Sequence, residues 1–251
     1  MKKEILKYTE DYIESNAAEA HGNLKTILNF SNISEETQKE FHAKITDKAC
    51  LNIHFHPDRY SNNILTIDSL IESGEYKNQF QTKTSSGSLT AEIGGDRDIW
   101  ENKLFNNLIG DSLKERPKYG SLNLTCTSDG SSPRFGSCYF ITYPKTKLSS
   151  TFTYGDSYLL PKERGTITNF TQIYTKLYND IFTRNNALGT HYESINDFIT
   201  KTSTILDSQK LNEKLSHNLD FYIEAQIHDT IDLKNDVACL VVDYSYMKTE
   251  F

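Results

Sequence analysis

The sequence predicts an α+β fold, and three observations lead to this prediction. Apolar residues recur at helical spacing through residues 3–49, the period changes to two from Leu51, and helical spacing returns over about 166–217. Strands therefore dominate the centre of the chain, while helices gather at its start and in one insertion. We expect an N-terminal helical region over 1–49 and a mixed domain over 50–251 that contains the insertion.

The expected helices carry recognisable periodicity and start signals. Ile5, Tyr8 and Tyr12 share a helical face, and Ser34 is placed to cap a second helix that carries Phe41 and Ile45. Further helices are predicted over about 63–72, over about 98–108, and within the insertion on both sides of a break at Asn185, Asn186 and Gly189.

The expected strands are short and rich in tyrosine and phenylalanine, which suit the faces of a sheet. Alternation of apolar and polar residues predicts seven of them. They are expected at 51–56, 78–84, 119–126, 135–143, 149–154, 221–228 and 237–243. No repeat and no long linker divides the chain into two globular units.

Composition excludes two classes of function. The net charge of −7 argues against binding to a nucleic-acid backbone, which usually requires a basic face. With a mean hydropathy of −0.58 and no window near the roughly 20 apolar residues of a spanning helix, the chain is not expected to act in a membrane.

The N-terminus and the cysteines bear on the compartment. The start, 1-MKKEILKYTEDY-12, has no apolar segment of the kind that a cleaved secretory signal contains. Synthesis in a bacterial cytoplasm is expected, and export by a route that reads no such signal stays open. The four cysteines are scattered without a C-x-x-C pair, which indicates reduced thiols rather than structural zinc.

The stretch 54-HFHPDR-59 ends the first predicted strand and supports three interpretations. His54 and His56 lie on one side of the strand, as a pair of metal ligands would. Alternatively, Arg59 grips a phosphate through two parallel hydrogen bonds. In the third interpretation this is an ordinary turn, with Asp58 capping the next helix. Further metal ligands, if needed, could come from Asp96, Glu101, Asp156 or His228.

The run 84-TSSGSLTAEIGGDRDIWE-101 combines small hydroxyl residues with glycines, which let a backbone approach a ligand closely. It matches neither the Walker nor the dinucleotide-binding glycine pattern. The alternative is a loop that leads into a helix capped by an aspartate. The candidate ligand contacts in this run are Ser85, Ser86, Gly87, Gly94, Gly95, Asp96, Arg97, Trp100 and Glu101.

Two later strands carry polar side chains that could line a cleft. Arg134 and Asp156 lie beside glycines at strand ends, where a hairpin end or a bulge is the commoner explanation. The strand at 222–228 is more informative because one whole face of it is polar. That face consists of Tyr222, Glu224, Gln226 and His228.

Six ordered motifs over about 50–245 resemble a bacterial domain family catalogued as being of unknown function. They are HFHPDR, TSSGSLTAEIGGDRDIWE, PKYGSLNL, PRFGSCYF, TFTYGDS and YIEAQIH. That family is linked to arginine-serine-glutamate mono-ADP-ribosyltransferases, including a secreted bacterial effector that modifies arginine on a host metabolic enzyme. The resemblance implies an ADP-ribosyltransferase-like split β-sheet that cradles NAD, and an acceptor protein such as glutamate dehydrogenase.

The resemblance also implies roles for individual residues. Arg59 would bind the phosphate and ribose of NAD, and Ser85 with Ser86 would support it, with 150-STFT-153 as the alternative. The catalytic glutamate is Glu101 or Glu224. If Glu224 is instead the first residue of the usual Gln/Glu-x-Glu pattern, Gln226 occupies the catalytic position. Cofactor contacts are then expected from His54, His56, Arg59, Ser86, Gly87, Gly94, Gly95, Asp96, Arg97, Trp100, Arg134 and Gln226.

The implied chemistry is physically consistent with these residue types. Cleavage of the bond between nicotinamide and ribose develops positive charge on the sugar, which one carboxylate can stabilise. The same carboxylate can orient or deprotonate the acceptor. Three hypotheses follow: an NAD-dependent transferase, a metal-dependent hydrolase that uses His54 and His56, and an inactive module that binds NAD or a peptide.

Overall fold

The computed structural model describes residues 2–61, 63–83, 91–110, 112–216 and 218–248. Three helices begin the chain: α1 (Lys2–Ser15), α2 (Ala17–Phe30) and α3 (Glu35–Lys48). The predicted cap of α3 is confirmed, because the Ser34 hydroxyl accepts a hydrogen bond from the backbone N–H of Thr37 at 3.0 Å. Phe41 and Ile45 are buried on the inner face of this helix.

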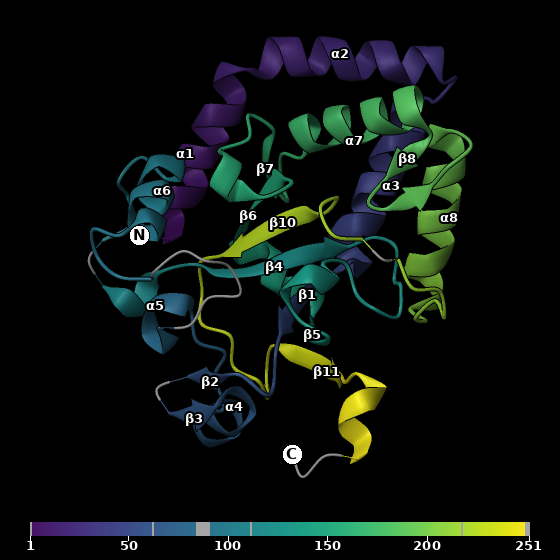
Figure 1. Cartoon of the computed structure of the whole chain (residues 1–251). Coiled ribbons are helices and arrows are strands. Elements are labelled where there is room, and N and C mark those ends of the chain that lie inside the picture. Colours follow the sequence, from purple (N-terminus) through teal and green to yellow (C-terminus); the bar gives the residue numbers. More distant parts are fainter. Residues whose placement is uncertain (1, 62, 84–90, 111, 217, 249–251) are drawn as a thin grey trace.

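A seven-stranded sheet forms the centre of the molecule, and all of its strand pairs are antiparallel (Figure 1). In spatial order the strands are β11 (Val237–Val241), β5 (Cys138–Thr142), β1 (Cys50–Phe55), β4 (Lys118–Asn123), β10 (Ile223–Ile227), β6 (Ser150–Tyr154) and β7 (Arg164–Thr166). Six of the seven predicted strands lie in this sheet. A large antiparallel sheet with separate groups of helices confirms the predicted α+β class.

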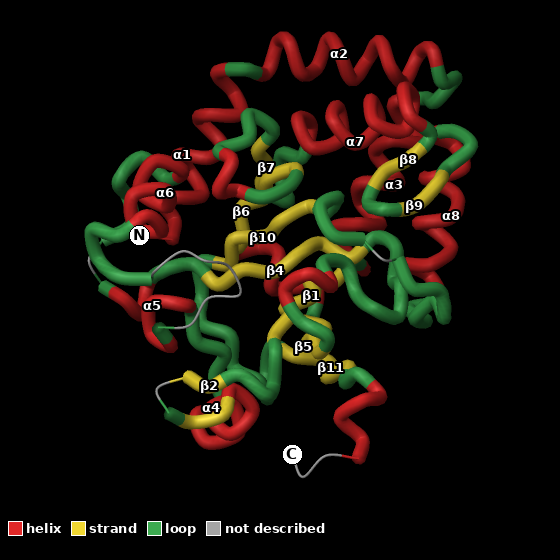
Figure 2. The backbone as a smooth tube through the Cα atoms, in the orientation of Figure 1, coloured by secondary structure: helices red, strands yellow, loops and turns green. Residues whose placement is uncertain are grey.

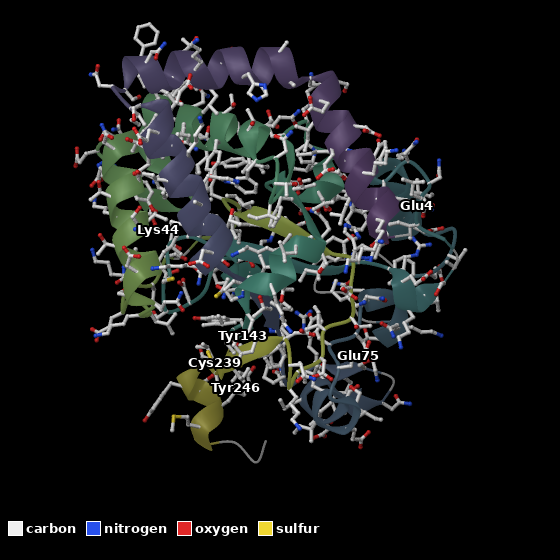
Figure 3. All side chains as sticks on the ribbon, turned by 180° about the vertical axis from the view of Figure 1, so that it is seen from behind. Glu4, Lys44, Glu75, Tyr143, Cys239 and Tyr246 are labelled. Atoms are coloured by element: carbon white, nitrogen blue, oxygen red, sulfur yellow. The ribbon has the colours of Figure 1, made fainter. Side chains whose placement is uncertain are left out.

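Helices from the N-terminal region and from the insertion cover the apolar face of the sheet. The insertion folds into α7 (Thr171–Arg184) and α8 (Ile195–Ser208), joined by the small hairpin of β8 (Asn186–Ala187) and β9 (Thr190–His191). α2 runs along α7 and α3 lies beside α8, as the views from both sides show (Figures 1 and 3). In the described part of the chain, none of the helices combines the length and apolar character that membrane crossing requires.

The alternation of the strand sequences decides which face is buried against these helices. In β1 and β10 the apolar residues join the main core, while their polar neighbours point to the opposite face. The apolar residues concerned are Leu51, Ile53, Phe55, Ile223, Ala225 and Ile227. The opposite, polar face of the sheet is therefore free of these core helices and can contact the connecting segments.

The connecting segments form short elements around the central sheet (Figure 2). They comprise β2 (Tyr60–Ser61), β3 (Ile64–Leu65), α4 (Thr66–Ser73), α5 (Gln79–Thr82), α6 (Asp96–Leu104) and the 3₁₀ turns η1 (Leu113–Glu115), η2 (Pro133–Phe135), η3 (Pro144–Ser149), η4 (Ser157–Leu159) and η5 (Tyr244–Lys248).

One predicted strand is wrong. The segment predicted as a strand over 78–84 contains the short helix α5 instead, and residue 84 lies outside the described residues. A reciprocal cap explains the difference: Asn78 accepts from the backbone N–H of Gln81 at 3.0 Å, and the Gln81 side chain accepts from the backbone N–H of Asn78 at 3.2 Å. These two bonds stabilise a helical turn that the alternation of side chains does not reveal.

Candidate functional site

The central sheet forks at β1. Residues 50–52 of this strand pair with β4, whereas residues 52–55 pair with β5. Asn52 is the branch point, since it lies opposite Ser121 on one side and Ile141 on the other. Beyond Asn52, β1 and β4 no longer share a ladder, and β1 continues with β5 and β11 alone.

A continuous line of polar side chains crosses this fork. Asn52 of β1 lies opposite Ser121 of β4, Ser121 lies opposite Glu224 of β10, and Glu224 lies opposite Thr153 of β6. We call these four residues the polar row. Directly opposed residues share one face, with Cβ atoms about 5 Å apart. A parallel line consists of Tyr119, Gln226, Thr151 and Thr166.

The loop before β5 folds back over the polar row. Ser131 and Ser132 both lie within hydrogen-bonding distance of the Ser121 hydroxyl, at 2.6 and 2.8 Å. The backbone N–H of Ser131 donates to the Asn52 side-chain oxygen at 3.1 Å. Gly130 permits this approach, because its φ is +75° and a Cβ there would lie 2.5 Å from Nε2 of His54.

His54 is held as a neutral imidazole at the end of this loop. The backbone N–H of Ser132 donates to Nε2 at 3.3 Å, so the ring proton is on Nδ1, which donates to the Gly136 carbonyl at 2.8 Å. Burial lowers the pKa of His54 to about 4. Both ring nitrogens are engaged within the protein, which leaves no lone pair for a metal.

The alternative interpretation as a metal site finds no cluster in the described residues, where no three His, Cys, Asp or Glu side chains gather closely enough to hold a metal ion. His228 illustrates the separation. It is buried under the edge of Phe105 and bonds Thr151 at 2.9 Å, and burial lowers its pKa to about 3.

Glu224 is the central acidic group of the polar row. It is 5% exposed, and its Oε1 accepts a hydrogen bond from the Gln226 amide at 2.9 Å. Burial raises the pKa of Glu224 to about 7, with a further contribution from the charge of Asp156, against the opposing effect of Ser157 and Gln226. A carboxyl that titrates near neutrality can take up and release a proton under physiological conditions.

Glu101 is also buried, but its carboxylate is saturated. It accepts from Arg116 at 3.2 Å and from the Tyr119 hydroxyl at 2.8 Å, and Arg97 lies at 3.5 Å. Arg116 also pairs with Asp98. Burial raises the pKa of Glu101, while all three neighbours oppose that effect. These bonds tie α6 to β4.

The glycine-rich approach to α6 is part of the same anchor. The backbone N–H of Gly94 donates to the Asp98 carboxylate at 2.8 Å, and Gly95 and Asp96 begin the helix. The guanidinium carbon of Arg97 lies 4.7 Å from the centre of the Trp100 ring, which in turn stacks on Tyr119. These contacts fix the helix against the sheet.

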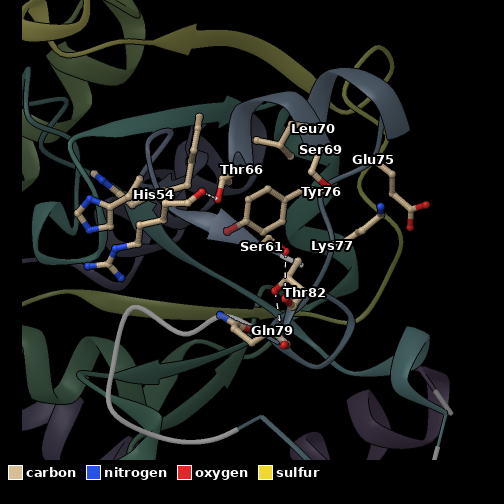
Figure 4. Close-up of a pocket in the computed structure, with 13 residues that line it drawn as sticks. His54, Ser61, Thr66, Ser69, Leu70, Glu75, Tyr76, Lys77, Gln79 and Thr82 are labelled. Atoms are coloured by element: carbon tan, nitrogen blue, oxygen red, sulfur yellow. Dashed lines mark hydrogen bonds between the residues drawn. The ribbon is translucent and has the colours of Figure 1, made fainter. Parts of the chain in front are cut away.

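Arg59 lines a small pocket at the other end of β1, beside His54 and His56 (Figure 4). The Arg59 carbonyl accepts from both the N–H and the hydroxyl of Thr66, at 2.8 and 2.9 Å, which fixes the turn after β1. Lys77 adds a second cation to the lining, and Glu75 adds a carboxylate beside it. The pocket has a volume of about 80 Å³, room for a single small group such as a phosphate.

The remaining predicted site residues are Arg134, Ser85, Ser86 and Gly87. Arg134 is a surface residue that pairs with Asp220 at 2.7 Å and lies over the Phe135 ring. Ser85, Ser86 and Gly87 lie outside the described residues. The alternative serine segment, 150-STFT-153, is β6, where Thr151 and Thr153 bond the Gln226 amide.

The sequence analysis did not identify several polar residues of the site. Some buried polar atoms in the site also lack a hydrogen-bond partner. Ser121, Ser131 and Asn52 are ordinary-looking residues whose association depends on strand register. Buried donors and acceptors are normally paired. Among the described residues, the buried atoms without a hydrogen-bond partner include Asn52 Nδ2, Trp100 Nε1, Tyr222 Oη and His228 Nδ1, all in or beside the two polar lines.

Comparison with known proteins places the sheet in a family. A search of curated proteins found no match to this chain. The family model described as "Protein of unknown function (DUF3626)" matches residues 50–251, which include the whole forked sheet and both sets of polar residues. The chain therefore belongs to the DUF3626 family.

Proposed function

We propose that the protein is an NAD-dependent mono-ADP-ribosyltransferase that modifies arginine on a target protein, built on an ADP-ribosyltransferase-like split sheet over residues 50–251. One observation carries the proposal. The fork places Glu224, whose pKa is raised to about 7, on a polar row that leads through Ser121 to the Asn52 branch point and the neighbouring His54, which shares a pocket with Arg59. A cationic end and an acidic end are thus joined along one face.

The residues fit the parts of an NAD molecule. The pocket with Arg59 and Lys77 suits one phosphate group but is too small for the dinucleotide, so the rest of it is proposed to extend toward the polar row, which requires the loop of Ser131 and Ser132 to move off that row. The unpartnered Asn52 Nδ2 and Tyr222 Oη supply polar atoms there. NAD supplies the ADP-ribosyl group and nicotinamide as the leaving group.

In the proposed reaction, residues of the protein would stabilise developing charge and hold the reacting groups in position. Glu224 in its ionised form stabilises positive charge that develops on a sugar beside it, and it can hold the proton of an acceptor. His54 is neutral and held by two hydrogen bonds, so it shapes the cleft without adding charge. Glu101 is proposed to position α6, because its carboxylate is already paired with Arg116 and Tyr119.

The proposal also covers the acceptor protein and the N-terminal helices. The acceptor would be a protein such as glutamate dehydrogenase in a host, reached by secretion. Among the helices of residues 1–49, α2 packs on α7 and α3 on α8, while α1 packs on β7 and β6, which favours a structural role for them.

The test is transfer of label from biotinylated NAD to proteins of a cell extract. Wild type is compared with Arg59→Ala, Glu101→Ala and Glu224→Ala, and each variant's unfolding midpoint is recorded. Loss of labelling in Glu224→Ala and Arg59→Ala with intact folding supports the proposal. If the wild type labels no acceptor and releases no nicotinamide, the proposal is wrong.

An inactive NAD-binding module is the second candidate, and the state of Gln226 favours it over the hydrolase. If Gln226 holds the catalytic position, that position is a neutral amide that donates to Glu224 and Thr153 and accepts from Thr151. Calorimetric binding of NAD without hydrolysis or transfer would identify the module. The hydrolase finds no support, since both nitrogens of His54 are engaged.

A further inference from the structure

A second cavity lies between α2, α3 and the start of α7, and its volume is about 800 Å³. Three segments that are apart in the sequence line it, within 14–29, 33–43 and 168–174. None of its described lining residues belongs to the Arg59 pocket or to the polar row. α2 runs along α7 on this side of the molecule (Figure 1). The volume lies in the range of about 300–1,000 Å³ that is usual for ligand pockets.

The floor of this cavity is apolar. It consists of Leu24 and Leu28 of α2, Ile33 after that helix and Phe170 just before α7, none of which is more than 9% exposed. All four side chains also belong to the main hydrophobic core. An apolar ligand on this floor would remove further apolar surface from water, which favours its binding.

The polar side chains between α3 and α7 are paired with one another. The Tyr178 hydroxyl donates to the Gln38 side-chain oxygen at 2.6 Å, and the Tyr174 hydroxyl lies 2.9 Å from Nδ1 of His42. The two tyrosine rings stack with their centroids 5.5 Å apart. Of the described buried polar atoms that lack a hydrogen-bond partner, none lies on a residue that lines this cavity. The floor therefore favours an apolar ligand body over a polar one.

Two ammonium groups stand at the rim of the cavity. Lys25 of α2 and Lys39 of α3 are exposed, and the ion pairs that lysines form within the described residues involve other lysines. Glu14, on the same rim, accepts a hydrogen bond from the Asn169 amide at 3.2 Å. Glu35 lies in the first turn of α3, where the helix dipole stabilises its charge. The rim can therefore receive a negatively charged ligand group.

The cavity is elongated along α2. His21 and Asn29 both line it, so its wall on this helix extends over about 12 Å at the rise of 1.5 Å per residue. Leu24 and Leu28 lie between them, one turn apart on the same face. An extended alkyl chain contacts such a stripe along its whole length, which a compact ring does not.

We propose that this cavity binds a medium-chain fatty acid. Its alkyl chain would lie along Leu24 and Leu28, and its carboxylate would be bound between Lys25 and Lys39. The site goes beyond the proposed transferase function and does not depend on it. Because the walls come from α2, α3 and the start of α7, the bound acid would hold the N-terminal helices against the family domain.

The test is calorimetric titration of the full chain with sodium decanoate. Wild type should bind one equivalent, and decanoate should raise the unfolding temperature because it binds only the folded chain. The double variant Lys25→Met, Lys39→Met keeps apolar stems but loses both charges, so its affinity should fall about five- to tenfold. The matched double variant Lys3→Met, Lys7→Met removes the same charge from exposed positions of α1 and should bind decanoate as wild type does.

A third variant and two further ligands separate the chain from the charge. Ala43→Trp fills the cavity from an exposed position of α3 and should abolish binding. Butyrate keeps the carboxylate but has too little apolar surface to bind measurably, whereas decanol keeps the chain and should bind several-fold more weakly than decanoate.

Four results would overturn the inference. They are no binding of decanoate to wild type, wild-type affinity in a folded Ala43→Trp variant, wild-type affinity in the Lys25 and Lys39 double variant, and equal affinities for decanol and decanoate. Each of these results leaves the transferase proposal standing, because none of the substituted residues belongs to the Arg59 pocket or the polar row.

Discussion

Glu101 and Glu224 are both buried in this protein, and burial raises the pKa of each, yet their surroundings differ. Glu101 receives hydrogen bonds from Arg116 and Tyr119, with Arg97 close by. Glu224 interacts with two neutral neighbours, Gln226 and Ser157, and the charge that acts on its pKa is that of Asp156, a second carboxyl group, instead of a cation.

The difference separates an anchor from a reactive group. A buried carboxylate surrounded by arginines is stabilised as an anion and has no capacity left for a ligand. A buried carboxyl without a cation holds its proton up to neutral pH and gains most from a positively charged partner.

Removing Arg116 should have the largest effect on stability. Arg116→Met leaves Glu101 and Asp98 without their shared cation, and breaking a buried pair in this way typically costs about 3–5 kcal/mol of unfolding free energy. Urea unfolding measures it. Lys201→Met, which removes an exposed partner of Asp197, is the matched control and should cost under about 1 kcal/mol. Equal costs would contradict the role of anchor.

Stability should depend on pH through Glu224. Its pKa in the folded protein is about 7, against 4.5 as the usual value, so its stabilising contribution is complete below pH 4.5 and is lost as pH rises through 7. The total is of order 3 kcal/mol. The unfolding free energy of wild type minus that of Glu224→Gln should therefore fall between pH 5 and pH 8. A constant difference would show that Glu224 does not titrate there.

Removing Arg59 should weaken NAD binding. Because a hydrogen bond to a charged group contributes about 1.5–3 kcal/mol, Arg59→Ala should raise the KM for NAD by about tenfold or more. Arg59→Lys should recover part of the loss, since it keeps the charge without the paired donors. Lys39→Ala on α3 is the control for charge alone. An unchanged KM would remove Arg59 from the cofactor site.

Removing metal ions should have no effect. Both ring nitrogens of His54 are bonded to the chain, so dialysis against EDTA should leave transfer and NAD hydrolysis unchanged. Activity is measured before dialysis, after dialysis, and after zinc or iron is restored. Loss with EDTA and recovery with one metal would return the hydrolase hypothesis to consideration.

Local patterns predicted most of the fold. Alternation located β1, β4, β5, β6, β10 and β11, and the Ser34 cap located the start of α3. The short edge strand β7 was not predicted. The strand predicted over 78–84 was wrong, because the reciprocal bonds of Asn78 and Gln81 stabilise a helical turn there. Such bonds depend on side-chain geometry, which the apolar pattern does not encode.

The candidate site was less predictable because it depends on strand register. The polar face of β10 was visible in the sequence, but its neighbours Ser121 and Asn52 become part of the site only when β4 lies between β10 and β1. The sequence also did not reveal that the Glu101 carboxylate is fully paired, because its partner Arg116 lies 15 positions away in the sequence.

The most direct test of the central claim is the NAD hydrolysis rate of Glu224→Gln and Glu101→Gln, measured with their unfolding midpoints. We predict that kcat falls at least about a hundredfold in Glu224→Gln, which keeps its fold, because the group that stabilises the developing charge is lost. Glu101→Gln should lose stability but retain most of the activity of its folded fraction. A folded Glu101→Gln variant that is as inactive as Glu224→Gln, or an active Glu224→Gln variant, would contradict the account.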